Sequence, residues 1–520
     1  MTILIANAYV VPGAGRDPIP DTDILIEGDR IAAIGKGVGE GRRVSQTIDG
    51  TDRIVMPGFV NAHTHSNESF EQGFYDALPL EVWLLHKYPP FAIQPLPERV
   101  HYLRTMLLAI ESLRSGVTTV QDDLINRLAE PQAFDGSAAA YRDIGLRAAI
   151  TTSMSDRDMV APLPWADTML APELYAELAR LKARPWQEHI AFFERHYARW
   201  NNAGDGRIRV ILGPLGPQWC SDRLMQEATA ISLARTIPVH THTLESKVHA
   251  VQGEMLYGRP IVEHLADIGV LTPNFTLNHA IWLTDRELDL VAEKGACVTH
   301  NPLSNLKLGA GVARVPDMLK RGIPVALGTD GTCTSDRADM LRSLSLAAVV
   351  HRVGEMDYST WPTADDAFRM ATVGGARSTL LADEIGVLAV GRKADLVLYD
   401  RGDYGFIPLK DAVAQLTYAV NSEAVRTVLV DGQVVMRERA LTLIDEAAIK
   451  AEMREEAERY LRDHVPAMEA AVKRFEPYWR DMQLRTALTD VPASRAPVRL
   501  PCACQPSVRH TRTSFRAEWG

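Results

Sequence analysis

Short apolar runs, rich in β-branched residues, recur along the middle of this 520-residue chain, and most end in a polar or ionisable residue. Longer stretches with the spacing of amphipathic helices separate them. Strand and helix in such alternation predict an α/β fold, a (β/α)8 barrel, whose chemistry sits at the C-terminal ends of the strands. The expected strands cover residues 56–65, 116–122, 146–152, 207–213, 237–242, 275–279, 297–300 and 325–330.

Shorter segments of alternating apolar and polar residues, punctuated by Gly and Asp, flank this barrel on both sides. They occupy residues 1–57 and 388–440, and neither piece is long enough to bury a core alone. We therefore expect both to join in one small β-sandwich attached to a barrel of residues 58–387.

Two further segments follow the expected sandwich. Residues 441–488 have a helical composition and heptad-like apolar spacing, with a break near Pro466. Residues 489–520 are rich in Pro, Arg, Ser and Thr, and we expect this tail to be disordered because it offers no packed core.

The composition narrows the class of protein. With 46% hydrophobic and 23% charged residues, the chain resembles soluble globular proteins, and its net charge of -10 argues against nucleic acid or anionic membranes as partners. Because no basic leader and no apolar run of roughly 18 residues is evident, we expect a cytoplasmic protein. The five cysteines, including Cys502 and Cys504, match no zinc-knuckle or CxxC pattern, so we expect free thiols.

Histidines mark the ends of several expected strands. His63 and His65 are two residues apart, so in an extended strand their imidazoles face the same side and form half of a metal site. A barrel brings the ends of its strands together, and the residues available there to complete the site are His242, His279, His300 and Asp330.

Six motifs follow one another in order over residues 1–440. They are Pro57-Gly-Phe-Val-Asn-Ala-His63-Thr-His65, His242-Thr-Leu-Glu245, Asn278-His279, His300-Asn-Pro-Leu-Ser-Asn, Gly328-Thr-Asp330-Gly331 and Gly386-Val-Leu-Ala-Val-Gly391-Arg-Lys-Ala-Asp395. Each motif alone is weakly specific, but six in register are strong. Together they resemble the amidohydrolase superfamily, in particular the mononuclear branch of nucleoside, guanine and pterin deaminases and triazine hydrolases.

The resemblance implies one divalent metal held by His63, His65, His242 and Asp330. Three neutral imidazoles and a carboxylate suit Zn²⁺ or Fe²⁺ and leave a position for water, whose pKa the ion lowers toward neutrality. Relatives with two metals bridge them through a lysine at the end of the fourth strand. Gly213-Pro214 stands there instead, which argues for a single ion.

Three residues receive catalytic roles from the same resemblance. Glu245 is the expected proton shuttle to a ring nitrogen of the substrate, Asp330 takes the proton of the water, and His279 hydrogen-bonds the attacking oxygen. The expected reaction is attack on an amidine-like ring carbon with loss of ammonia.

The remaining polar and aromatic candidates have two interpretations each. His240 shares a strand face with His242, but the His-x-x-Glu spacing selects His242 as ligand and gives His240 a supporting place. His300 is either a substrate contact or a loop support. The others are Trp83, Gln218 and Trp219 as pocket residues, with helix packing as the alternative for Trp83, and Glu68 and Asp122 as substrate contacts or, slightly favoured, ordinary charges.

Three functions fit this pattern. The first is an aminohydrolase acting on a nitrogen heterocycle such as a purine, pterin or triazine. The second is a chlorohydrolase or alkylamine hydrolase of an s-triazine-like ring, which Glu245 disfavours because loss of chloride needs no strong acid. The third is a non-catalytic barrel, which had no reason to retain every ligand. We expect the first, acting on a small heterocycle, in a homo-oligomer, most simply a dimer.

Overall fold

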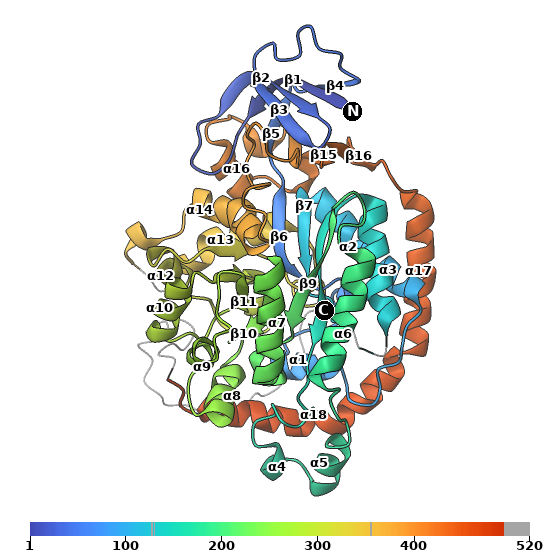
Figure 1. The fold of residues 1–520 in the computed structure, drawn as a ribbon, viewed down its shortest axis with the longest axis vertical. Helices are drawn as coiled ribbons and strands as arrows, with labels where there is room; N and C mark the ends of the chain where they lie inside the picture. The colour runs from blue at the N-terminus through green and yellow to red at the C-terminus, as the bar shows by residue number, and fades with distance from the viewer. Residues whose placement is uncertain (126–127, 129, 354–355, 493–520) are drawn as a thin grey trace, which may run out of the picture.

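The computed structural model describes residues 1–492 apart from 126–127, 129 and 354–355 (Figure 1). The predicted disorder of the tail and the thiols of Cys502 and Cys504 therefore fall outside the described residues. A barrel occupies the centre of the molecule, a smaller sheet lies at one end, and the last two helices run along the side and across the opposite end. No helix among the described residues is long and apolar enough to span a bilayer.

Eight parallel strands, hydrogen-bonded in chain order from β6 to β13, form the barrel, which confirms the predicted fold. The seam between its first and last strands is closed by the backbone N–H of Asp330, which donates to the carbonyl of His63 at 2.9 Å. The strands are β6 (Phe59–Thr64), β7 (Val117–Asp122), β8 (Arg147–Met154), β9 (Ile208–Pro214), β10 (Val239–Thr243), β11 (Phe275–His279), β12 (Cys297–His300) and β13 (Val325–Leu327).

Two adjacent glycines allow a helical segment to pack on this seam. A Cβ atom on Gly374 would lie 2.1 Å from the carbonyl oxygen of Val325, and one on Gly375 would lie 2.5 Å from the Cβ of Val60. Both distances are shorter than any real contact. Gly374 ends a single π-helical turn (Met370–Gly374) and Gly375 begins α15 (Gly375–Ser378), so the close approach to β6 and β13 depends on glycine.

The second sheet contains nine strands from both ends of the chain, as predicted for the sandwich. Strand β14 pairs with β5, which joins the C-terminal and N-terminal pieces directly. Some of its buried side chains form a separate core, and others, such as Met56, Tyr399 and Val428, belong to the core shared with the barrel. The strands are β1 (Thr2–Val10), β2 (Ile19–Glu27), β3 (Arg30–Gly35), β4 (Gln46–Asp49), β5 (Arg53–Pro57), β14 (Leu396–Asp400), β15 (Val425–Val430), β16 (Gln433–Arg437) and β17 (Ala440–Leu441).

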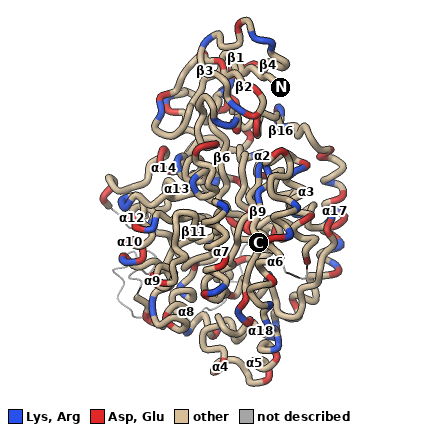
Figure 2. Tube along the Cα trace, in the orientation of Figure 1, with Lys and Arg blue, Asp and Glu red and all other residues tan. Residues whose placement is uncertain are grey.

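Helices cover the outside of the barrel and one of its ends (Figure 1). Acidic and basic residues are interspersed along the described chain rather than gathered by sign (Figure 2). The helices are α1 (Leu80–Lys87), α2 (Glu98–Arg114), α3 (Pro131–Ile144), α4 (Ala166–Met169), α5 (Pro172–Leu178), α6 (Trp186–Trp200), α7 (Asp222–Arg235), α8 (Lys247–Tyr257), α9 (Ile261–Asp267), α10 (Asp285–Lys294), α11 (Pro302–Lys307), α12 (Val315–Lys320), α13 (Met340–Val349), α14 (Ala364–Arg369), α16 (Ala412–Tyr418), α17 (Glu446–Asp463) and α18 (Val465–Leu488).

A buried ion cluster joins the barrel to the second sheet. Arg147, at the start of β8 and only 2% exposed, donates from Nε and Nη2 to the carboxylate of Asp395 at 3.0–3.2 Å. Its Nη2 also donates to Asp431 at 2.5 Å, and the backbone N–H of Asp431 donates to Asp395. The guanidinium therefore bridges two carboxylates of the sheet, and the ammonium group of Lys393 supplies a second positive charge to Asp431 at 2.9 Å.

We predict that Arg147→Met lowers the free energy of unfolding by about 3–5 kcal/mol, because it leaves the buried carboxylate of Asp395 without its cation, whereas Asp431 keeps Lys393. Chemical denaturation followed by circular dichroism measures the change. The matched control is Arg142→Met, since Arg142 is 45% exposed beside Asp143 and such surface pairs contribute about 1 kcal/mol or less. Equal effects of the two substitutions would contradict this role of Arg147.

Candidate functional site

Polar side chains from several strands meet at the C-terminal end of the barrel. The backbone turns abruptly there, because Leu244, His279, Ala280 and Asp330 all have positive φ angles of 48–70°, a region that side chains other than glycine seldom adopt. Strained backbone of this kind is typical of functional sites. It directs the side chains that follow β10, β11 and β13 toward the barrel axis.

Three imidazoles at this end are fixed through their Nδ1 atoms. The Nδ1–H of His65 donates to the carbonyl of Asp123 at 2.6 Å, and that of His242 donates to the carbonyl of Leu215 at 3.0 Å. The Nδ1 of His279 lies 2.8 Å from the Oδ1 of Asn305. Each partner is an acceptor, so each ring carries its proton on Nδ1 and leaves the Nε2 lone pair free.

His63 is held by another histidine. Its Nδ1 lies 2.8 Å from the Nε2 of His240, whose own Nδ1 lies 2.8 Å from the side-chain amide of Gln121. The amide nitrogen of Gln121 faces the Nδ1 of His240. Turning that amide over lets the Nδ1–H of His240 donate to the amide oxygen, and the Nε2 of His240 then accepts from the Nδ1–H of His63. In this arrangement the Nε2 of His63 is free as well. His240 thus supports His63 and does not itself face the cavity.

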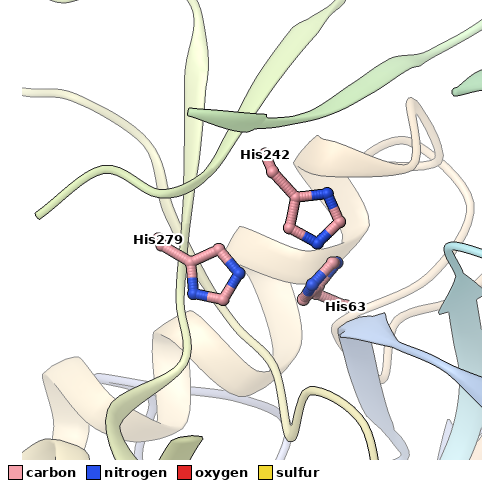
Figure 3. A group of neighbouring side chains, drawn as sticks. All are labelled: His63, His242 and His279. Atoms are coloured by element: carbon pink, nitrogen blue, oxygen red, sulfur yellow. The ribbon is translucent and has the colours of Figure 1, made fainter. Parts of the chain in front are cut away.

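The free ring nitrogens approach one another around a single point. Figure 3 shows the rings of His63, His242 and His279 gathered there, each from a different strand end. The Nε2 of His65 lies 3.3 Å from that of His242 and 3.3 Å from the Oδ1 of Asp330. The Nε2 of His63 lies 3.6 Å from the same carboxylate oxygen and, like the Nε2 of His279, is buried without a hydrogen bond.

This donor set fits a divalent cation. Two ligands about 2.0–2.2 Å from a tetrahedral zinc ion are about 3.3–3.5 Å apart, close to the separations around Asp330. Burial lowers the pKa of His63 and His242 well below the usual value, so both rings are neutral, as ligands must be. Burial alone would lower the pKa of His65 and raise that of Asp330. Without an ion, protonated His65 donates from Nε2 to Asp330, which raises the pKa of His65 and, together with His279, lowers that of Asp330. The carboxylate therefore stays charged, and a bound ion would take the place of the Nε2 proton of His65.

Glu245 stands beside this group of ligands. Its Oε1 lies 3.7 Å from the Nδ1 of His279, and its carboxyl group is 4% exposed. Burial first, and then the negative charges of Asp330 and Glu81, raise the pKa of Glu245 well above its usual value. A carboxyl group whose pKa is raised keeps its proton to a higher pH than a free glutamic acid does, and it can donate that proton.

A cavity of about 290 Å³ opens onto these residues. Trp83 and Gln218, two predicted substrate contacts, line it, and so does Trp219. Its walls are largely apolar. Beside the predicted His65, Glu68, His242, Glu245 and Asp330 they include Leu80, Glu81, Leu84, Met159, Leu163, Val248, His249, Gln252, Trp479, Met482, Gln483 and Thr486.

Three other predicted candidates have different surroundings. His300 does not line this cavity; its ring packs 5.2 Å from that of His351, which favours its alternative as a loop support. Glu68 does line the cavity, where it accepts from the hydroxyl of Tyr88 at 3.2 Å. Asp122 accepts from the backbone of Ser66 and the hydroxyl of Tyr141, so it is structural.

Two features of the site leave only a weak signal in the sequence. Glu81 is a single acidic residue in an amphipathic helix, and such a residue ordinarily faces solvent. Here it lines the cavity, and the hydroxyl of Ser246 donates to it. Residues of α18 line the same cavity, although no pattern in the sequence relates that helix to the strand ends.

Comparison with known proteins agrees with this geometry. The model of the amidohydrolase family matches residues 54–435. A 5-methylthioadenosine/S-adenosylhomocysteine deaminase of Caldanaerobacter subterraneus subsp. tengcongensis is 30% identical over 465 residues, which cover 89% of this chain and 100% of that protein. The chain belongs to the amidohydrolase family. Members of this kind are hydrolases of carbon–nitrogen bonds in cyclic amidines, and this chain is such an enzyme.

Two solved amidohydrolase structures with zinc have the same fold. An adenosine deaminase from Xanthomonas campestris with bound zinc has a TM-score of 0.76 and 29% identity, covering 88% of this chain and 98% of its own. Atrazine chlorohydrolase TrzN from Arthrobacter aurescens TC1, complexed with zinc, has a TM-score of 0.78 and 26% identity, covering 88% and 100%. Together with the histidine and aspartate groups described above, they support a divalent metal in this amidohydrolase.

We predict that a chelator lowers the thermal unfolding temperature and that added Zn²⁺ restores it, because an ion that binds only the folded state adds about 2.7 kcal/mol at a hundred times its Kd. Differential scanning calorimetry measures the shift. His63→Ala should abolish the response to zinc, whereas His264→Ala, on α9 and paired with Asp222, should retain it. A wild-type unfolding temperature indifferent to both reagents would exclude the site.

Proposed function

We propose that this amidohydrolase removes the exocyclic amino group of an adenine nucleoside and releases ammonia. The observation that carries the proposal is the placement of Glu245, whose pKa burial raises, beside His279 and Asp330 at the inner end of the cavity. The relatives named as deaminases of 5-methylthioadenosine and adenosine support an adenine nucleoside as substrate.

We further propose one Zn²⁺ per chain, held by His63, His65, His242 and Asp330. When bound, the ion lowers the pKa of a water molecule and so supplies a nucleophile at neutral pH. Strand β9 ends in Gly213 and Pro214, so it offers no lysine to bridge a second ion. The buried carbonyl and amide partners of the imidazoles keep every Nδ1 proton in place and thus orient the ligands.

The protein residues manage the protons of the reaction. Glu245 donates its proton to the ring nitrogen beside the amino-bearing carbon, which makes that carbon more electrophilic. Asp330, kept anionic, accepts a proton from the attacking water and passes it toward the leaving amine. His279, with its Nδ1–H directed at Asn305, presents Nε2 as an acceptor that orients the attacking oxygen.

Glu81 favours a nucleoside over a bare heterocycle. Its Oε2 is buried without a hydrogen-bond partner, whereas the hydroxyl of Ser246 donates to its other oxygen. Burial raises the pKa of Glu81 to about 7. A hydrogen-bond donor on the substrate would pair with the Oε2 atom and stabilise the charged form of Glu81. The vicinal hydroxyls of a ribose supply such donors.

The similarity to atrazine chlorohydrolase TrzN keeps a second candidate, hydrolysis of a chlorinated s-triazine. This reaction expels chloride, which needs no proton, so a carboxyl group with a raised pKa has less to contribute. Assays of ammonia from aminated heterocycles and of chloride from chlorotriazines distinguish the two functions.

We predict that Glu245→Gln lowers turnover of adenine nucleosides by about 10²- to 10⁴-fold, the usual effect of removing a general acid or base. Glutamine keeps the shape but cannot transfer the proton. Both wild type and variant should retain one equivalent of zinc, measured by elemental analysis on the preparation used for the ammonia assay. Loss of zinc in the variant, near-full activity, or two equivalents in the wild type would count against these assignments.

We predict that Glu81→Gln reduces the preference for adenosine over 2′,3′-dideoxyadenosine by about tenfold, since one charge-assisted hydrogen bond contributes about 1.5–3 kcal/mol. The ratio of the two kcat/KM values is the measurement. Glu476→Gln on α18 is the control, because Glu476 is 43% exposed and does not line the cavity. An unchanged ratio in Glu81→Gln would remove Glu81 from ribose recognition.

We also propose, as the sequence led us to expect, that the enzyme is a cytoplasmic homodimer. Sedimentation velocity of the purified protein and fractionation of cells test these two statements.

A further inference from the structure

The last helix of the described chain forms part of the cavity that contains Glu245. Trp479, Met482, Gln483 and Thr486 of α18 line this cavity. The helix crosses the end of the barrel opposite the small sheet, close to α1 and α8 (Figure 1). The cavity is therefore bounded on its inner side by the strand ends and on its outer side, in part, by α18.

The apolar face of α18 is firmly packed. Trp479 and Met482, 6% and 5% exposed, share one core cluster with Val82 and Leu85 of α1 and Leu170, just after α4. Side chains that are rigidly supported by packing can discriminate between substrates of different size. Trp479 and Met482 are thus part of a packed core and do not form a loose cover over the cavity.

Polar contacts hold the middle and the C-terminal end of the same helix. Arg474 near its middle forms an ion pair with Glu177 of α5, and the ammonium group of Lys247 in α8 donates to the carbonyl of Ala487 at 3.0 Å. These contacts tie α18 to elements that follow two different barrel strands, β8 and β10.

The preceding helix, α17, is tied to the catalytic side of the barrel. The hydroxyl of Tyr460 donates to the buried carboxylate of Glu71 at 2.7 Å, and Lys87 of α1 forms an ion pair with that carboxylate. Glu71 ends the short helix Ser66–Glu71, which begins directly after His65. The position of α18 is therefore coupled to the segment that carries a metal-ligand candidate.

Polar atoms without partners face this cavity from both sides. The Oε1 atoms of Gln483 on α18, Gln252 on α8 and Gln218 after β9 are buried and make no hydrogen bond within the described chain. Leaving a buried acceptor unsatisfied costs about 1–3 kcal/mol, so such atoms usually have a partner in the working protein. A bound molecule that spans the cavity would supply donors for them.

We propose that α18 is the specificity-determining wall of the substrate pocket. The part of the substrate farthest from the departing amino group lies against Trp479 and Met482, and a polar part of the same molecule donates to Gln483. The apolar character of the two side chains selects a nucleoside with a small apolar substituent, an alkyl or thioether group, at its 5′ carbon. This inference rests on the proposed deamination of an adenine nucleoside.

The test compares 5′-methylthioadenosine with 5′-deoxyadenosine, which differ by one thiomethyl group distant from the amino group. The ratio of their kcat/KM values is measured by ammonia release for the wild type and for two full-length, zinc-loaded variants. Met482→Ala removes the contact, and Met482→Phe fills the space. Each should lower the ratio by about three- to tenfold, since burying one or two methylene-sized groups changes affinity by about this factor.

Leu484→Ala is the matched control, because Leu484 lies two residues away on the same helix but is 55% exposed. It should leave the ratio unchanged, and circular dichroism melting curves establish that each variant is folded. Turnover with a ratio unchanged in both Met482 variants would overturn the inference about α18 alone. Absence of ammonia from both nucleosides with the wild type would overturn the proposed function and this inference with it.

Discussion

Buried ring nitrogens dominate this structure, and within the described residues the Nε2 atoms of His63 and His279 have no hydrogen-bond partner. His65, His242 and His279 each use Nδ1 for a protein acceptor, and these three rings and that of His63 direct Nε2 at the same small volume. Asp330 adds a negative charge to that volume. Placing lone pairs and a carboxylate so close together is repulsive unless a cation lies between them. The need for a cation therefore follows from the Nδ1 hydrogen bonds that orient the imidazole rings as well as from the presence of the rings.

The fold holds these histidines and Asp330 together despite the electrostatic repulsion between them. The backbone hydrogen bond from Asp330 to His63 closes the seam between the first and last barrel strands, so the same two residues close the barrel and belong to the site. Gly374 and Gly375 let a helix pack on that seam. Farther away, Arg147 fastens the sheet formed by both chain ends to the barrel. Strained backbone at the strand ends is tolerated because the surrounding core fixes it.

Local spacing and strand order made much of this predictable from the sequence. His63 and His65 share a strand face because they are two residues apart, and the spacing of His242 and Glu245 distinguished His242 from His240. Features that depend on tertiary packing were not predictable. Glu81 looks like any acidic residue of an amphipathic helix, and its role arises only because α1 is covered by α18. His300 ends a strand as His279 does, yet its ring packs against that of His351, whereas His279 lies beside Glu245 and Asp330.

The most direct test of this account is anomalous X-ray diffraction from crystals of the zinc-loaded protein, with data collected on both sides of the zinc absorption edge. The account predicts one anomalous peak per chain, bounded by the Nε2 atoms of His63, His65 and His242 and by the carboxylate of Asp330. A chain without a peak among these four residues, or with a second peak beside the first, would contradict it.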